Sequence, residues 1–402
     1  MFASGQFITP VLPTPREKEY EELNDLVIEV VSSARALHAA APDHVARPLA
    51  TMLTLLNCYY SNLIEGNVTH LVDIERAMKN DYSHDQQKRN LQYESFAHVE
   101  TERAMRQQLH RDPSLAVPSK DFICGLHKEF YSRLPEKFRK VTRPNGEIVD
   151  IVPGQIRQPG EEVKVGLHFA PEAKEVLNGL RFFEEQYSHE RLNGIANRIM
   201  AIACAHHRLV YIHPFIDGNG RVSRLLATAM AIRSGIDSFG LWSVSRGLAR
   251  QNVRYKELLA AADAKKHFAT DGRGKLSMSA LCLFTKFFLE TCLDQIQYMT
   301  GLLNLGSLAE RIKGYVAFRA ASSDPLHEQS QYILMHILAT GGCDRATARR
   351  LTGLKDRAAN EIIGQLLKEG LLTSEGQRQP LMLGLPSRAL NFYFPNLYSG
   401  IS

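Results

Sequence analysis

One short loop of this sequence gathers the residue types that phosphate chemistry needs. It runs from His213 to Arg224 and reads His-Pro-Phe-Ile-Asp-Gly-Asn-Gly-Arg-Val-Ser-Arg. Gly218 and Gly220 permit a tight backbone turn and carry no Cβ that would cover neighbouring N–H groups. Because the apolar periodicity predicts a helix that starts near Asn219, these N–H groups would lie at a helix N-terminus, which is a natural site for a phosphate.

The charged side chains of the loop support this interpretation. Arg221 and Arg224 lie three residues apart, on one face of the first helical turn. An exposed cation at a helix N-terminus interacts unfavourably with the helix dipole, at a cost of ~0.3–1 kcal/mol. Two of them therefore indicate that an anion binds between them. Asp217 is the only carboxylate of the loop, and beside phosphates it suits Mg²⁺. His213 is placed to take a proton from an incoming hydroxyl at neutral pH.

The loop resembles the signature of the Fic family, His-Pro-Phe-x-Asp/Glu-Gly-Asn-Gly-Arg-x-x-Arg, at every fixed position. A His-Pro turn or a Gly-Asn-Gly loop alone is usually only structural, but the joint pattern favours a functional site. The resemblance extends over roughly residues 120–300. It includes residues 157–166, which are similar to the family's flap hairpin, and residues 241–259, which are similar to the helix that closes its nucleotide pocket.

This resemblance implies a transfer of AMP from ATP to a Tyr, Thr or Ser hydroxyl of a protein. By their places in the motif, His213 would be the general base and Asp217 the Mg²⁺ ligand. Gly220 favours nucleotidyl transfer, because the kinase-like branch of the family has Lys there. The flap would hold the target by pairing with its backbone. The residues that would contact the nucleotide are Gly218, Asn219, Gly220, Arg221, Arg224 and Tyr255.

Ser61 and Glu65 form a second informative pair, one helical turn apart and directly before Gly66. A carboxylate in the last helical turn is unfavourably placed in the helix dipole, and alone it would be an ordinary exposed Glu. The segment resembles the Fic inhibitory motif, Ser/Thr-x-x-x-Glu-Gly/Asn, and precedes the core as in one class of the family. The resemblance implies that Glu65 pairs with Arg224, displaces the γ-phosphate and keeps the isolated protein autoinhibited.

Helices must position these residues, because apolar residues recur at helical spacing through most of the chain. Helices are expected at residues 49–63, 122–130, 171–187, 195–209 and 222–230. Gly66 would terminate the first of them, and Pro171 would open the third. Strand signal is scarce, and residues 155–166 are the best case for a hairpin. We therefore expect a mostly α protein with a Fic-fold helical core and a small β-hairpin flap.

A small polar segment, residues 320–325, precedes a different pattern. Three short helices, each followed by glycine, are expected at 333–338, 344–351 and 362–367, and residues 371–373 and 381–383 could pair as a wing. This outline predicts a C-terminal winged helix-turn-helix domain. The expected regions are an N-terminal helical region with the inhibitory helix at 1–118, a Fic catalytic core at 119–320 and the winged helix-turn-helix domain at 321–402.

Composition excludes several classes of protein. The 402 residues predict two or three domains, and the 44% hydrophobic content excludes wholesale disorder. The net charge of +5 is too small for a nucleic-acid or membrane coat. The six cysteines lack CxxC pairs and indicate reduced thiols. No signal peptide or bilayer-spanning segment is recognisable, so we expect a cytoplasmic protein without a membrane partner.

The sequence leaves three functions open. The first is an autoinhibited adenylyltransferase that uses Mg²⁺ and ATP, with a protein substrate that could be the chain itself. The second is an enzyme of the same fold that removes AMP or uses another nucleotide. The third is a DNA-binding regulator with a nucleotide-sensing Fic domain, which the intact His213 disfavours because sensing needs no general base. The C-terminal region could equally bind DNA or dock proteins, and homodimer formation is also open.

Overall fold

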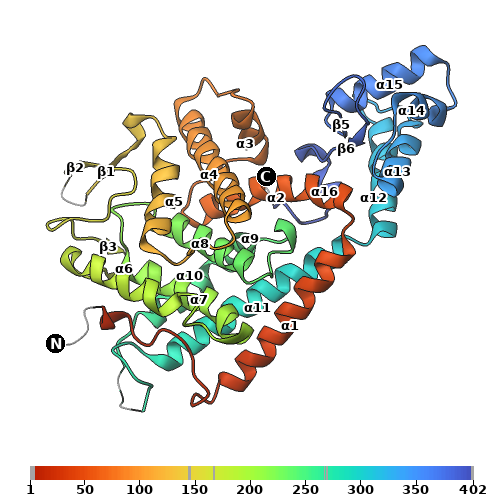
Figure 1. The fold of residues 1–402 in the computed structure, drawn as a ribbon. Helices are drawn as coiled ribbons and strands as arrows, with labels where there is room; N and C mark the ends of the chain where they lie inside the picture. The colour runs from red at the N-terminus through yellow and green to blue at the C-terminus, as the bar shows by residue number, and fades with distance from the viewer. Residues whose placement is uncertain (1–4, 144–145, 166–167, 267, 269, 400–402) are drawn as a thin grey trace.

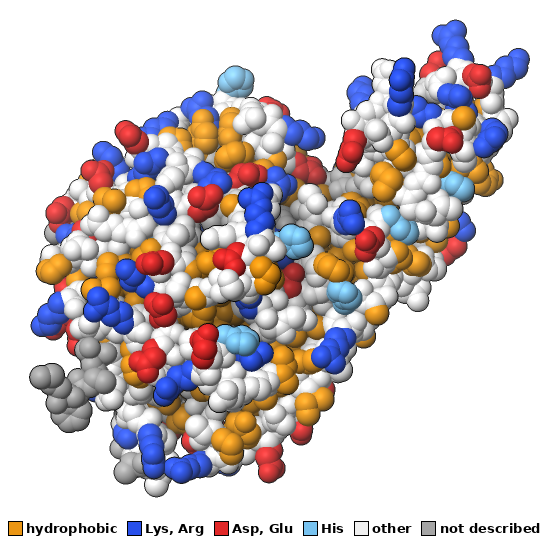
Figure 2. Space-filling view, in the orientation of Figure 1, with side chains coloured by type: hydrophobic (Ala, Val, Ile, Leu, Met, Phe, Trp, Pro, Cys, Tyr) orange, Lys and Arg blue, Asp and Glu red, His pale blue; other side chains and the backbone are white. Residues whose placement is uncertain are grey.

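The computed structural model describes residues 5–143, 146–165, 168–266, 268 and 270–399. Helices dominate these residues, and the strands in this part of the chain form three separate two-stranded hairpins. The prediction of a mostly α fold is therefore confirmed. Figure 1 shows a rounded helical body and a smaller C-terminal lobe at its upper right, and the space-filling view in Figure 2 shows this lobe projecting from the body.

The body is built around two long buried helices, α7 and α11, and α1 packs along α11 for much of its length (Figure 1). In chain order, the α-helices of the body are α1 (Tyr20–Ala40), α2 (Asp43–Ile64), α3 (Leu71–Met78), α4 (Gln86–Arg111), α5 (Lys120–Ser132), α6 (Ala173–Tyr187), α7 (Gly194–Ile212), α8 (Asn219–Arg233), α9 (Val244–Arg250), α10 (Asn252–Ala262) and α11 (Met278–Leu302). The short 3₁₀ helices η1 (Gln6–Ile8), η2 (Glu136–Phe138) and η3 (Ser238–Gly240) lie in its loops.

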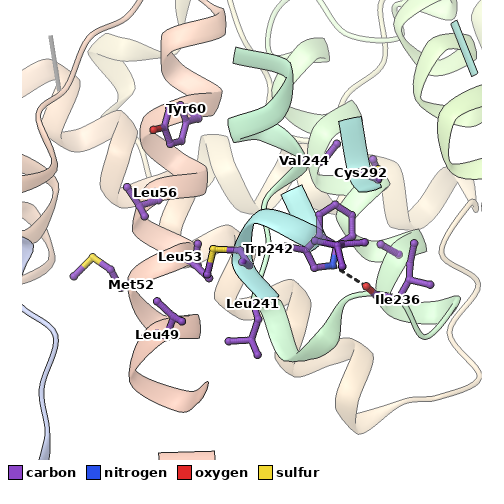
Figure 3. Close-up of a cluster of buried hydrophobic side chains, with 14 of the residues drawn as sticks. Leu49, Met52, Leu53, Leu56, Tyr60, Ile236, Leu241, Trp242, Val244 and Cys292 are labelled. Atoms are coloured by element: carbon purple, nitrogen blue, oxygen red, sulfur yellow. Dashed lines mark hydrogen bonds between the residues drawn. The ribbon is translucent and has the colours of Figure 1, made fainter. Parts of the chain in front are cut away.

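Helix α2 is fixed in the body by its apolar face. Figure 3 shows Leu53 of this helix on the side of Leu241 and Trp242, which lie just before α9. Leu53 and Leu56 are at most 1% exposed, and burying a side chain of this size contributes about 1.5–3 kcal/mol. Trp242 Nε1 donates a hydrogen bond of 2.7 Å to the carbonyl oxygen of Ile236, which lets the indole be buried (Figure 3). The helix predicted at 49–63 is thus confirmed and anchored on one side.

The other predicted helices of the body are also present, with small differences at their ends. The segments 122–130, 195–209 and 222–230 lie in α5, α7 and α8. Helix α6 begins two residues after Pro171, the position expected to open it. The carbonyl oxygen of Pro171 instead accepts a hydrogen bond from Arg157 at 2.9 Å, so this residue belongs to the loop before the helix.

Two hairpins lie near the predicted flap. Strand β3 (Lys164–Val165) lies at the end of the expected region 155–166, and it pairs antiparallel with β4 (His168–Phe169), which lies beyond that region. Residues 166–167 lie outside the described residues. A further hairpin, β1 (Lys140–Thr142) with β2 (Ile148–Asp150), was not expected from the sequence. Each of its strands is exposed, half-buried and exposed in turn, so apolar alternation could not reveal it.

The C-terminal lobe contains the elements expected there. Helix α12 (Leu305–Ala320) leads into α13 (Ser330–Thr340), α14 (Arg345–Thr352) and α15 (Asp356–Lys368), and strands β5 (Leu372–Thr373) and β6 (Met382–Leu383) pair antiparallel. A short helix not expected from the sequence, α16 (Ser387–Tyr393), follows, and residues 395–399 return to the body. The winged helix-turn-helix assignment and the three region boundaries remain predictions, and one continuous buried cluster runs from Ile8 to Leu397.

Two expectations about the chain's environment can be compared with the structure. All six cysteines are free thiols, and five of them are buried. Among the described residues, no helix combines the length and the apolar character that crossing a membrane requires.

Candidate functional site

The loop from His213 to Arg224 connects α7 to α8 through two residues with left-handed backbone. His213 is the C-terminal cap of α7 with φ 50° and ψ 60°, and Gly218 is the N-terminal cap of α8 with φ 82°. A Cβ at position 218 would lie 2.9 Å from Cε2 of Tyr131. This position therefore requires glycine for two reasons, its positive φ and the lack of space for a side chain. The first N–H groups of α8 lack acceptors within their helix and therefore form an anion-binding end.

The ring of His213 is oriented by the helix that it ends. Its Nδ1 lies 3.3 Å from the carbonyl oxygen of Val210. A carbonyl oxygen can only accept, so Nδ1 carries the proton of the neutral ring in this contact, and Nε2 is the nitrogen that can accept a proton. The orientation is suited to a general base acting through Nε2.

Arg157 holds the start of the loop from outside the motif. Its side chain is 1% exposed, and its Nε donates to the carbonyl oxygen of His213 at 2.7 Å. Its backbone N–H donates to the carbonyl oxygen of Pro214 at 2.8 Å, and further guanidinium bonds reach the carbonyl oxygens of Glu161 and Pro171. Burial lowers the pKa of Arg157, and the charges of Glu162 and Glu161 oppose this shift. Arg157 thus connects the flap region to the residue before the turn.

Asn219 closes the loop on itself. Its Oδ1 accepts a hydrogen bond of 2.9 Å from the backbone N–H of Phe215, and its Nδ2 donates one of 2.8 Å to the carbonyl oxygen of the same residue. The side chain amide is therefore used within the loop. Any contact of this residue with an anion would use its backbone N–H.

Asp217 lies at the exposed side of the loop and is held by Tyr131. The hydroxyl of Tyr131, which is 2% exposed, donates a hydrogen bond of 2.7 Å to Asp217 Oδ2. This bond leaves the other carboxylate oxygen, Oδ1, for a cation. Among the described residues, no group of three or more His, Cys, Asp or Glu side chains could hold a metal ion. A single exposed carboxylate fits Mg²⁺ that arrives with a nucleotide, because Mg²⁺ commonly uses one or two carboxylates and the substrate's phosphates.

Arg224 is bound to both residues of the second motif. Its Nε donates to Ser61 Oγ at 2.9 Å, and its Nη2 donates to Glu65 Oε1 at 2.5 Å. A Cβ at position 220 would lie 2.4 Å from Glu65 Oε1, so the carboxylate occupies the space that Gly220 leaves. Burial alone would raise the pKa of Glu65, but the charge and hydrogen bonds of Arg224 outweigh it and lower that pKa.

Arg221 has a partner that the sequence did not predict. Its Nη2 donates to Glu94 Oε2 on α4 at 2.8 Å, and its guanidinium lies 5.1 Å from the ring centroid of Phe130. Among the described residues, its buried Nε has no hydrogen-bond acceptor. Burial raises the pKa of Glu94, and the charge of Arg221 opposes that rise. Each arginine of the loop is therefore bound by one carboxylate from an N-terminal helix.

Tyr255 lies beneath this cluster and is 3% exposed. His206 Nδ1 lies 3.2 Å from the carbonyl oxygen of Ser223, so that nitrogen carries the proton and Nε2 accepts a 2.9 Å hydrogen bond from the hydroxyl of Tyr255. Burial raises the pKa of Tyr255 to about 12. The hydroxyl of Tyr255 is thus bound to His206 within the core.

The structure brings all predicted site residues to one end of α8, with Tyr255 below it. Sequence reasoning missed three residues that position them, namely Tyr131, Arg157 and Glu94. The segment 157–166 had been singled out as a flap, so Arg157 at its start could have been considered. No pattern in the sequence distinguishes Tyr131 or Glu94 from other polar residues on amphipathic helices.

The part of the chain that contains this loop matches a known protein family. Residues 117–231 match the family model of the Fic/DOC family. A protein called protein adenylyltransferase Fic from Drosophila mojavensis is 34% identical over 112 residues, which are 28% of this chain and 22% of that protein. Its namesake from Drosophila grimshawi is 38% identical over 90 residues, which are 22% of this chain and 18% of that protein. The chain thus spans only about a fifth of the length of these curated relatives.

Solved structures show the same fold over a larger part of the chain. A crystal structure of a Fic family protein from Desulfovibrio desulfuricans G20 aligns with a TM-score of 0.52 at 17% identity, covering 92% of this chain and 98% of that one. A Fic domain containing signaling protein from Bacteroides thetaiotaomicron aligns with a TM-score of 0.51 at 18% identity, covering 68% of this chain and 96% of that one. From its loop, its fold and these matches, the chain is a Fic-domain protein.

Proposed function

We propose that this protein transfers AMP from ATP to a hydroxyl group of a protein and that Glu65 restrains the reaction. One observation carries the proposal: His213, Asp217 and the N-terminal end of α8 lie on one continuous loop, and Glu65 is bound to Arg224 in the helix that follows it. The relatives called protein adenylyltransferase Fic support the same activity.

In the proposed reaction, the hydroxyl oxygen of the target attacks the α-phosphorus of ATP. The bond between the α-phosphorus and the bridging oxygen breaks, and pyrophosphate leaves. His213 accepts the hydroxyl proton through Nε2, because its Nδ1 is bonded to the carbonyl oxygen of Val210. Backbone N–H groups of residues 218–220 bind the phosphate oxygens, where charge develops in the transition state. Arg221 and Arg224 are the cations of the site.

Asp217 is the residue that would hold Mg²⁺. When bound, this ion neutralises phosphate charge and polarises the phosphoryl oxygens. Asp217 itself is oriented for this task by Tyr131, whose hydrogen bond fixes one carboxylate oxygen.

Glu65 restrains the reaction by occupying the guanidinium that would bind the γ-phosphate. A carboxylate and a phosphate compete for the same donors of Arg224, and both carry negative charge. ATP could then bind with its triphosphate displaced from the productive position. Ser61 holds the same guanidinium through its hydroxyl and its carbonyl oxygen, which keeps Arg224 aimed at Glu65.

The test is labelling of the protein with ATP that carries a radioactive α-phosphate, in the presence of Mg²⁺. Glu65→Gly should incorporate at least about tenfold more label than the wild type, since removing a restraint worth 1.4 kcal/mol changes an equilibrium tenfold. Adding His213→Ala to that variant should abolish the label. Mass spectrometry with ATP, UTP, CTP and GTP identifies the transferred group. Equal labelling of wild type and Glu65→Gly would contradict the proposed restraint, and label without dependence on His213 would contradict the proposed base.

A further inference from the structure

Residues 395–399, which follow the C-terminal lobe, lie against the last turns of α2. The hydroxyl of Tyr60 donates a hydrogen bond of 2.9 Å to the carbonyl oxygen of Leu397, and that of Tyr59 donates one of the same length to the carbonyl oxygen of Ser399. The N–H of Ser399 donates to the Tyr60 hydroxyl at 3.2 Å. Tyr59 and Tyr60 are fully buried.

Arg246 on α9 fixes this segment from the other side. Its Nη2 donates to the carbonyl oxygen of Asn396 at 2.6 Å, and its Nε donates to that of Leu397 at 3.2 Å. Its remaining contacts are the side chain of Gln295 and the ring of Tyr298, and the described residues offer it no ion pair. Arg246 is 2% exposed, so its charge depends on these carbonyl oxygens for compensation. Removal of the segment would leave a buried cation short of acceptors.

The segment also packs against the start of the next helix. Leu397 is fully buried, and the ring of Tyr398 meets that of Tyr59 edge-on at 4.9 Å. The hydroxyl of Tyr398 accepts a hydrogen bond of 3.4 Å from the N–H of Leu71, which begins α3. The 395–399 segment therefore lies across the junction between α2 and α3, and this junction contains Glu65.

The C-terminal lobe contacts the opposite end of α2 as well. His44 Nε2 donates a hydrogen bond of 2.8 Å to the carbonyl oxygen of Leu338 in α13. Between the two contacts lies an open groove of about 980 Å³, lined by Pro48, Thr51 and Met52 of α2 and by residues of the lobe. The lobe and the residues after it therefore hold α2 near its two ends.

We infer that the 395–399 segment is a strap that controls the Glu65–Arg224 ion pair, with Tyr60 and Arg246 as its positioning residues. Tyr60 directly precedes Ser61, and Glu65 lies five positions after Tyr60, a helical rise of about 7.5 Å. A displacement of the strap frees the last turns of α2 to move, and Ser61 and Glu65 then withdraw from Arg224 together. The inference rests on the proposed function in that this ion pair is taken to limit AMP transfer.

The strap gives the lobe a route to the phosphate site. A ligand or partner that moves the lobe relative to the body would pull on the residues after α16, which are continuous with it. The hydrogen bonds of Tyr60 and Arg246 would break before the apolar face of α2 separates from α9. Release of the restraint thus needs no unfolding of the body.

Two variants test this control. Tyr60→Phe removes one hydroxyl and keeps the buried ring, and Arg246→Gln removes the charge that holds two carbonyl oxygens. A buried neutral hydrogen bond changes an equilibrium about 2- to 12-fold, so Tyr60→Phe should raise labelling by α-labelled ATP within that range. Arg246→Gln should raise it further, because charge-assisted bonds are stronger. In both variants, backbone amides of residues 61–67 should exchange hydrogen faster, a readout that needs no catalysis.

Tyr393→Phe is the matched control, because the buried Tyr393 hydroxyl has no hydrogen-bond partner among the described residues. It should label and exchange like the wild type. Adding Tyr60→Phe to Glu65→Gly should give no further labelling, since the restraint is already absent. Unchanged exchange at residues 61–67 in both strap variants would overturn the inference. Faster exchange without increased labelling would also overturn it, provided Glu65→Gly labels strongly. If Glu65→Gly labels weakly, the proposed function is contradicted instead. Hydrogen exchange at residues 61–67 would then still show whether the strap holds the end of α2.

Discussion

Glu65 and Arg224 lie 159 positions apart in the sequence and are joined by an ion pair of 2.5 Å between Oε1 and Nη2. Glu65 is the C-terminal cap of α2, and Arg224 lies in the second turn of α8. The C-terminal end of α2 and the first turns of α8 therefore meet at this ion pair. Gly220 makes the contact possible, because any side chain there would meet the carboxylate.

The stability that the Glu65–Arg224 pair contributes to the fold should decrease only on acidification. The folded-state pKa of Glu65 is lowered, so the pair stabilises the fold above the unfolded pKa, near 4.5, and this stabilisation is lost as the pH falls through the folded pKa. The difference in unfolding free energy between wild type and Glu65→Gln should be constant from about pH 8 to about pH 5.5 and should shrink below about pH 4.5. Urea unfolding across this range measures it, and a difference that grows on acidification would contradict the assignment.

Glu94 should contribute more to stability than a surface carboxylate of the same helix. Glu94→Gln leaves the buried guanidinium of Arg221 without a carboxylate, and we expect a loss of about 1–3 kcal/mol in the free energy of unfolding. Glu100→Gln is the matched control, because its pair with Arg103 is more exposed and should contribute less than about 1 kcal/mol. Denaturant unfolding compares the two, and equal losses would show that Arg221 does not depend on Glu94.

Much of the fold could be predicted because amphipathic helices and their glycine ends are local features of sequence. Gly66, Gly341 and Gly353 end their helices with φ of 87°, 89° and 66°, a conformation that glycine adopts without strain. The hairpin of β1 and β2 could not be predicted, because its strands have no fully buried side. The return of residues 395–399 to α2 depends on Arg246 and Tyr60, which no local pattern associates with it.

The predicted site residues lie in two short motifs, which is why the sequence revealed them. The residues that position them come from elsewhere: Arg157 is 56 positions from His213, Tyr131 is 86 from Asp217, and Glu94 is 127 from Arg221. Their identity depends on tertiary contacts. The loop 213–224 can thus be recognised in a single sequence, whereas the residues that support it can be identified only from the fold.

Tyr131 should influence the use of Mg²⁺ more than the maximal rate. Tyr131→Phe keeps the ring beneath Gly218 and removes the hydroxyl that orients Asp217. In the Glu65→Gly protein, we expect the Mg²⁺ concentration for half-maximal AMP transfer to rise about 2- to 12-fold, the effect of one hydrogen bond, with the rate restored at saturating Mg²⁺. Titration with Mg²⁺ tests this against Tyr393→Phe. If the Mg²⁺ dependence of AMP transfer were unchanged, Tyr131 would have no role in metal binding.

The lobe should bind DNA only weakly. Figure 2 shows Lys and Arg side chains at its outer end, but acidic residues lie among them. Arg349 pairs with Asp356 at 3.6 Å, and Arg357 pairs with Glu361 at 3.3 Å. We expect any binding of duplex DNA by the full chain to disappear between about 50 and 200 mM salt, as for contacts with phosphates alone. Sequence-specific gel shifts that persist at the higher salt concentration would establish a DNA-binding lobe instead.

Arg157 should be required both for the geometry of the loop and for stability. Its guanidinium donates to several carbonyl oxygens, including that of His213, and its side chain is fully buried. Lysine keeps the charge but can reach fewer of these acceptors, so Arg157→Lys should lower the free energy of unfolding by about 2–4 kcal/mol, the value of one or two charge-assisted bonds. With Glu65→Gly as the background, AMP transfer should fall at least about tenfold at a temperature where the variant is folded, because misplacing a catalytic base by a fraction of a bond length is costly. Arg181→Lys, at an exposed position of α6, should change neither quantity. Full transfer activity by a folded Arg157→Lys protein would mean that the flap side of the loop does not position His213.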